Sequence, residues 1–248
     1  MKTLLKWKAV IVASAMLMAQ SAMAQEIPAL NANDYTKPAW TKLNRMIATL
    51  QPSTMPYSIN MTVNGDPSTR MAFAWFTNPE ITDGEVQIVA KADATVDDFL
   101  TPTITIKATA TDVKGLNYSI AKNKLTGIEP NTKADYCSHK AIATNLTPAT
   151  TYSFRVGNEK GWSEIGSFTT SSARKDETYS FIYITDTQAQ YDEMFDVSQK
   201  TVHTAYKMVP NAAFVLCNGD LVETSGSNNS EWEYEQWFST MQDVWMKC

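Results

Sequence analysis

The chain has 248 residues, of which 21 are Lys or Arg and 26 are Asp or Glu, so its net charge is −5 at pH 7. A nucleic-acid-binding protein needs a basic surface that follows phosphates, and this balance argues against one. The composition, 44% hydrophobic and 19% charged, is that of a folded globular protein. The length suits one large domain or two ordinary ones.

Residues 1–24 have the pattern of a cleaved secretory signal. Three lysines precede an apolar run over residues 9–19, and Ala22-Met23-Ala24 forms a small-residue cleavage motif before Gln25. The run is far shorter than the roughly 20 residues that span a bilayer. We therefore expect a soluble mature protein without a membrane anchor, in the periplasm or outside the cell. It retains 18 basic and 26 acidic residues, a net charge of −8.

Residues 25–54 form a lead-in segment, and residues 55–170 have the pattern of an antiparallel β-sandwich. Short segments of alternating or apolar character are separated by turn residues, with no helical period between them. The expected strands are Tyr57–Val63, Met71–Phe76, Glu85–Ala90, Thr103–Thr109, Ala141–Leu146, Thr151–Val156 and Ser163–Phe168.

A more specific signal lies at residues 146–156. Leu146, the turn residue Pro148 and Tyr152 at the start of a strand form the pattern of a tyrosine corner. This stretch resembles the penultimate strand of a fibronectin type III domain. The polar residues 171–177 then predict a linker to a second domain.

Residues 178–248 change to an α/β pattern. A strand over Tyr179–Thr185, a helix over 192–208 and an apolar, buried strand over Ala212–Cys217 predict a βαβ unit with a parallel pair of strands. A last helix is expected from Glu231 to Met246. Its aromatic residues could stack on sugars or bases, but their helical spacing favours a core role.

An aspartate follows each of the two predicted parallel strands, in Thr185-Asp186-Thr187-Gln188 and in Asn218-Gly219-Asp220. Ligands of open α/β sheets bind beyond the carboxyl ends of the strands, so both carboxylates should face one crevice. At such a short distance, two carboxylates repel each other unless a cation or a shared proton lies between them. Alternatively, each aspartate alone could be a helix N-cap or a turn former.

These two motifs resemble the first two metal-binding motifs of the calcineurin-like metallophosphoesterases. With the sandwich ahead of them, the chain resembles the N-terminal part of a purple acid phosphatase-like protein. The resemblance implies a fibronectin III-like sandwich followed by the start of an α/β (α/β/β/α-type) metallophosphoesterase domain. It also implies two metal ions (Fe, Zn or Mn) that activate a water to hydrolyse phosphate esters.

When the family's ligands are carried over by position, the resemblance implies that Asp186 is a terminal metal ligand and that Asp220 bridges two metals. Gln188 occupies a position that is often His in the family, so it is a ligand or a neighbour of one. Purple acid phosphatases proper have a metal-binding Tyr three residues after the second aspartate, where this chain has Glu223. That difference favours a plainer phosphoesterase.

The family completes its site with a Gly-Asn-His segment and later histidines, whereas this sequence has only His139 and His203. We expect structural or surface roles for both, and read the chain as an incomplete, inactive N-terminal part of a larger enzyme. The alternative is a non-catalytic secreted binding module built on the sandwich. Three cysteines, Cys137, Cys217 and Cys248, establish no disulfide framework.

Overall fold

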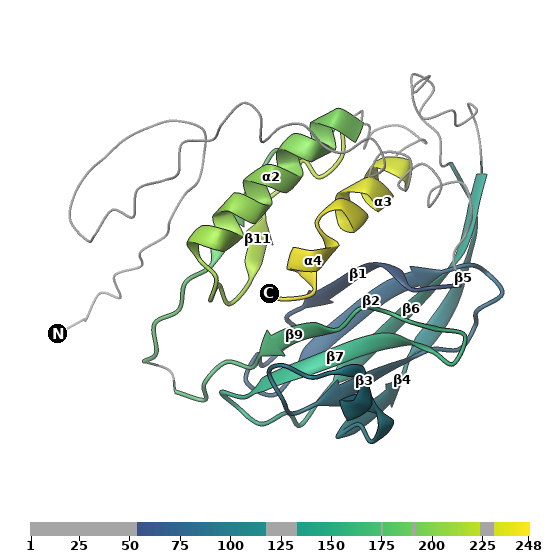
Figure 1. Cartoon of the computed structure of the whole chain (residues 1–248). Helices are drawn as coiled ribbons and strands as arrows, with labels where there is room; N and C mark the ends of the chain where they lie inside the picture. Colours follow the sequence, from purple (N-terminus) through teal and green to yellow (C-terminus); the bar gives the residue numbers. More distant parts are fainter. Residues whose placement is uncertain (1–53, 118–132, 175, 190–191, 224–230) are drawn as a thin grey trace, which may run out of the picture.

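The computed structural model describes residues 54–117, 133–174, 176–189, 192–223 and 231–248. The predicted signal and almost all of the predicted lead-in segment lie outside these ranges. The described residues form a β-sandwich with a smaller α/β unit packed on it (Figure 1). No helix among them is both long enough and apolar enough to cross a membrane.

The sandwich consists of two antiparallel sheets, which confirms the predicted fibronectin III-like architecture. One sheet has the order β1-β2-β6-β5, and the other has the order β4-β3-β7-β8 with β9 also paired to β7. The first contains β1 (Tyr57–Thr62), β2 (Met71–Thr77), β5 (Thr109–Asn117) and β6 (Lys133–Ala143). The second contains β3 (Glu85–Val89), β4 (Ile104–Lys107), β7 (Thr151–Asn158), β8 (Gly161–Trp162) and β9 (Gly166–Thr169), with a short 3₁₀ helix, η2 (Val96–Leu100), between β3 and β4.

Three of the expected strands differ from the structure. The strand predicted over Ser163–Phe168 begins only at Gly166, in β9. The strand predicted over Thr103–Thr109 spans a crossover, because the chain leaves one sheet after Lys107 and enters the other at Thr109. The strand predicted over Ala141–Leu146 begins eight residues earlier, at Lys133. Its first half alternates polar and apolar residues too weakly to be recognised, since His139 points inward with Cys137.

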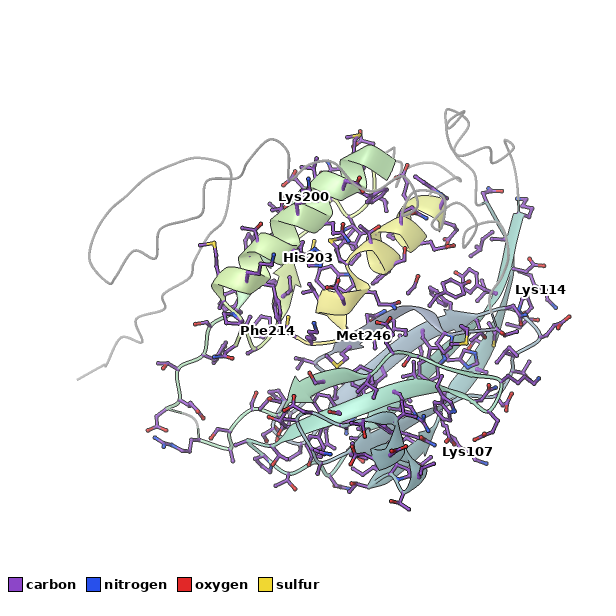
Figure 2. The ribbon with its side chains drawn as sticks, viewed as in Figure 1. Lys107, Lys114, Lys200, His203, Phe214 and Met246 are labelled. Atoms are coloured by element: carbon purple, nitrogen blue, oxygen red, sulfur yellow. The ribbon has the colours of Figure 1, made fainter. Side chains whose placement is uncertain are left out.

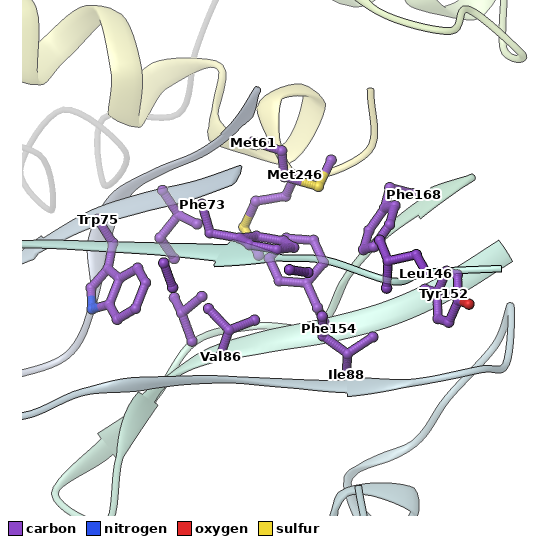
Figure 3. Close-up of a cluster of buried hydrophobic side chains, with 14 residues drawn as sticks. Met61, Phe73, Trp75, Val86, Ile88, Leu146, Tyr152, Phe154, Phe168 and Met246 are labelled. Carbon is purple, nitrogen blue, oxygen red and sulfur yellow. The ribbon is translucent and has the colours of Figure 1, made fainter. Parts of the chain in front are cut away.

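The sandwich core is aromatic and closely packed. The rings of Phe73 and Phe154 lie 4.8 Å apart, and Phe168 lies 5.8 Å from Phe73 (Figure 3). Residue 166 must be glycine because a Cβ there would lie 2.4 Å from the Phe154 ring. These contacts join the two sheets, and burial of the rings is the main source of stability.

The predicted tyrosine corner is confirmed. The Tyr152 hydroxyl accepts a hydrogen bond from the backbone N–H of Thr147 at 2.9 Å. We expect Tyr152→Phe to lower the free energy of unfolding by about 1 kcal/mol, because it leaves that N–H without its partner. Urea unfolding measures the effect. The same change at the exposed Tyr179 is the control, and an equal loss there would contradict this account.

The α/β unit contains the predicted parallel pair, β10 (Ile182–Ile184) and β11 (Val215–Cys217), joined through α2 (Asp192–Met208). Both strands are shorter than predicted. β11 is also less buried than expected: Leu216 is 44% exposed, because the helices pack on the opposite face, which carries Ile182 and Ile184. The predicted last helix is interrupted at Met241, giving α3 (Glu231–Thr240) and α4 (Gln242–Trp245).

The aromatic residues of these last helices have the core role that their spacing predicts. Trp237 and Trp245 stack at 4.8 Å within the core of the α/β unit. The chain then turns onto the sandwich, where Met246 joins the sandwich core (Figure 3) and its carbonyl accepts the Ser167 N–H at 2.8 Å. Gln242 Oε1 accepts the Ile59 N–H at 2.9 Å. The sandwich therefore supports the end of the α/β unit directly.

Candidate metal site

The carboxyl ends of β10 and β11 lie side by side and place the two aspartate loops together. Ile184 pairs with Cys217 in the parallel register. Beyond the paired strands, the Asn218 N–H donates to the Ile184 carbonyl at 3.0 Å, and the Asp186 N–H donates to the Gly219 carbonyl at 3.4 Å. Asp186 and Asp220 thus belong to neighbouring loops at one edge of the sheet, and both are exposed.

Both aspartates have an unusual backbone conformation. Asp186 has φ +55° and Asp220 has φ +47°, in the left-handed region that few residues other than glycine adopt. Gly219, with φ +115°, provides the freedom for two successive residues of positive φ. Aspartate is among the few L-residues that tolerate this region. Backbone strain of this kind concentrates at functional sites, where the surroundings hold it in place.

Gln188, the third predicted ligand, has an unsatisfied oxygen. Its Oε1 is buried and accepts no hydrogen bond within the described part of the chain. A buried acceptor without a partner costs about 1–3 kcal/mol, and a bound cation would remove that cost. Two carboxylates and an amide oxygen are hard ligands that suit Mn²⁺, Mg²⁺ or iron.

This donor set fits one metal ion at most. Within the described ranges, no three His, Cys, Asp or Glu side chains gather into a metal-binding group. Catalytic metals have three protein ligands and an open position. The three residues Asp186, Gln188 and Asp220 therefore fit one part of a dinuclear centre, whose other ligands would have to come from elsewhere. Their assignment as ligands stays a prediction.

His139 lies in the sandwich core rather than before a strand. It is buried in β6, its ring stacks on Trp75 at 5.2 Å, and Nε2 bonds the Thr77 hydroxyl at 2.8 Å. Burial lowers the pKa of His139, against the smaller opposing effects of the Ile81 backbone and the Asp83 carboxylate. The predicted structural role is confirmed.

This histidine makes the stability of the sandwich depend on pH. Because the pKa of His139 is lower in the folded state than the value of about 6.5 in the unfolded chain, the unfolded state binds more protons as the pH falls. We expect its contribution to stability to be complete above about pH 6.5 and to decrease below it. Urea unfolding at pH 7.5 and 5.0 tests this. His139→Gln should show a smaller difference between the two pH values, and an equal difference in both proteins would contradict the assignment.

His203 joins two helices. His203 lies on α2 (Figure 2), and its Nε2 lies 2.9 Å from both carboxylate oxygens of Asp243 on α4. The bond from His203 lowers the pKa of the Asp243 carboxyl. The role is structural, as predicted.

The three cysteines are free. Cys217 was predicted to be buried in its strand but is half-buried, with Sγ 3.7 Å from the Gly219 carbonyl. Burial raises the pKa of this thiol and keeps it protonated.

Two residues that support the loops were not identified from the sequence. Both are on α3: Glu233 forms a hydrogen bond with the Asp220 loop, and Trp237 forms one with the Asp186 loop. Trp237 was predicted only as a core residue, and Glu233 was not singled out. A glutamate one turn before a buried tryptophan is the only signal that the sequence offers for this pair.

The fold and the two loops define a sandwich followed by a parallel βαβ unit with carboxylates at one edge of its sheet. Residues 56–170 match the family model described as the purple acid phosphatase N-terminal domain. This part of the chain is therefore a fibronectin-like domain of the purple acid phosphatase type.

The solved structure of a purple acid phosphatase from yellow lupin seeds shares the fold, with a TM-score of 0.53 and 13% identity over 78% of this chain. The chain spans about a third (34%) of the lupin protein. A fibronectin domain of human contactin 1 matches with 16% identity over 51% of this chain and 85% of its own, at a TM-score of 0.31. Comparison with the curated proteins gave no match.

Proposed function

We propose that this chain is the sandwich and the first βαβ unit of an exported, metal-dependent phosphoesterase, and that it is inactive without further ligands. One observation carries the proposal. A domain of the purple acid phosphatase type is followed by two parallel strands whose adjacent ends each present an aspartate in a left-handed conformation. Purple acid phosphatases use dinuclear metal centres.

In the proposed enzyme, Asp186 and Asp220 would hold the metals, and Gln188 would be a ligand or the neighbour of one. A bound dinuclear centre supplies an activated water and offsets the charge of a phosphate ester. The contribution of this chain is to fix the carboxylates at one sheet edge before the metal arrives. The hydrogen bond between the two loops and the positive φ angles support that role.

The coding sequence beyond codon 248 tests the proposal first. We expect the reading frame to continue, directly or after a shift, into a Gly-Asn-His segment and later histidines. A stop codon with no such segment downstream would leave the dinuclear centre without ligands and overturn the proposal.

The second candidate is a secreted, non-catalytic module that binds a protein or glycan through the sandwich. The observation behind it is the fibronectin-like sandwich, which is a complete pair of sheets among the described residues. Bound metal discriminates between the two, because the enzyme requires two ions per complete protein and the binding module requires none.

A further inference from the structure

Helix α3 contacts both aspartate loops through two buried side chains. The Oε2 of Glu233 accepts the backbone N–H of Glu223 at 2.8 Å, three residues after Asp220. The indole N–H of Trp237 donates to the Thr187 hydroxyl at 2.8 Å, one residue after Asp186. Glu233 and Trp237 are four residues apart and so lie on the same face of the helix.

The chemistry of Glu233 argues against a role in packing alone. Its side chain is fully buried (0% exposed), and burying a carboxylate is costly unless hydrogen bonds compensate for it. A carboxylate that accepts a backbone N–H forms one of the stronger hydrogen bonds in proteins. An apolar residue would fill the same space but leave the Asp220 loop without this attachment.

The Asp186 loop is held from two directions. Besides the bond from Trp237, the Ser198 hydroxyl of α2 donates to the Thr187 carbonyl at 2.9 Å. Helices α2 and α3 lie side by side (Figure 1). Thr187 is therefore fixed at its backbone by one helix and at its side chain by the other.

Helix α3 is itself fixed on the sandwich. The Tyr136 hydroxyl of β6 lies 3.4 Å from Glu231 Oε2 at the first turn of α3, and Tyr57 of β1 and Tyr136 each pack against Phe76. Burial raises the pKa of Glu231. The sandwich thus sets the position of the helix that holds both loops.

We propose that Glu233 and Trp237 are positioning residues, which hold the Asp220 and Asp186 loops at the separation that metal binding requires. This role rests on the proposed function. Residues that orient metal ligands without touching the metal typically contribute 10–100-fold to metal affinity.

The test compares single variants of the 248-residue chain by Mn²⁺ binding, followed by electron paramagnetic resonance, and by amide hydrogen exchange. We expect Glu233→Ala and Trp237→Phe to weaken Mn²⁺ binding by about tenfold or more. We also expect them to speed amide exchange at residues 219–223 and 186–189, respectively. Glu233→Gln keeps an acceptor oxygen and should retain more affinity than Glu233→Ala.

Matched controls lie on α3 and on the adjoining α4. Trp245 is buried and stacked on Trp237, but its indole N–H has no partner within the described ranges, and the same holds for the Oε1 of the buried Gln236. Trp245→Phe and Gln236→Ala should leave Mn²⁺ affinity and loop exchange unchanged. If Glu233→Ala does not fold, the Trp237→Phe and Trp245→Phe pair decides the question.

Unchanged affinity and exchange in folded Glu233→Ala and Trp237→Phe would overturn the positioning role. Mn²⁺ binding that survives Asp220→Asn would instead refute the ligand assignment on which the proposed function rests. In that case amide exchange still decides whether α3 holds the loops.

Discussion

Asp220→Asn is expected to abolish metal-dependent hydrolysis of p-nitrophenyl phosphate by the complete gene product, with a loss of more than about 100-fold. The loss should exceed the 10–100-fold effect of residues that only orient a ligand, because Asp220 would itself be a metal ligand. Asp220 is exposed, so the change should leave the fold intact.

Asp112→Asn is the matched control for this experiment. Asp112 is an exposed carboxylate on the sandwich that pairs with Lys114 at 2.6 Å, far along the chain from the aspartate loops. Its replacement should leave hydrolysis unchanged. Full activity of Asp220→Asn would refute the site assignment.

Phe154→Ala is expected to cause the largest loss of stability, about 3–5 kcal/mol. Phe154 is fully buried, and its ring contacts Phe73 of the opposite sheet at a centroid distance of 4.8 Å. Its removal leaves a cavity between the two sheets, which the glycine at position 166 has no side chain to fill. Urea unfolding followed by tryptophan fluorescence measures the loss.

Leu100→Ala controls for truncation of an apolar side chain. Leu100 is 78% exposed, and we expect its replacement to change the free energy of unfolding by less than about 0.5 kcal/mol. A loss at Phe154 no larger than that would contradict the central position given to this ring.

Much of the fold follows from local signals in the sequence. Period-two alternation and turn residues predict most sandwich strands, and the Leu146-to-Tyr152 spacing predicts the tyrosine corner. These features succeed because each depends on neighbours within a few residues. The change of sheet at Ala108 could not be predicted, since Ile104–Lys107 and Thr109–Asn117 differ only in which distant strand they pair with.

The candidate site, like the fold, could be predicted from the sequence only in part. Asp186 and Asp220 were recognised because each lies within three residues of the end of an apolar strand. Parallel pairing then brings the two strand ends together. Glu233 was not recognised, because its partner is a backbone N–H in another loop and a glutamate on a helix is ordinarily solvent-exposed. The contact between the last helix and the sandwich was also missed, since it depends on how Met246 and Gln242 meet strands far away in the sequence.

The metal content of the complete gene product, measured by inductively coupled plasma mass spectrometry, tests the central claim most directly. We predict two Fe, Zn or Mn ions per wild-type protein and their loss in Asp220→Asn, with Asp112→Asn unchanged. A wild-type protein that retains no metal after purification in metal-supplemented buffer would contradict the phosphoesterase assignment and favour the binding module.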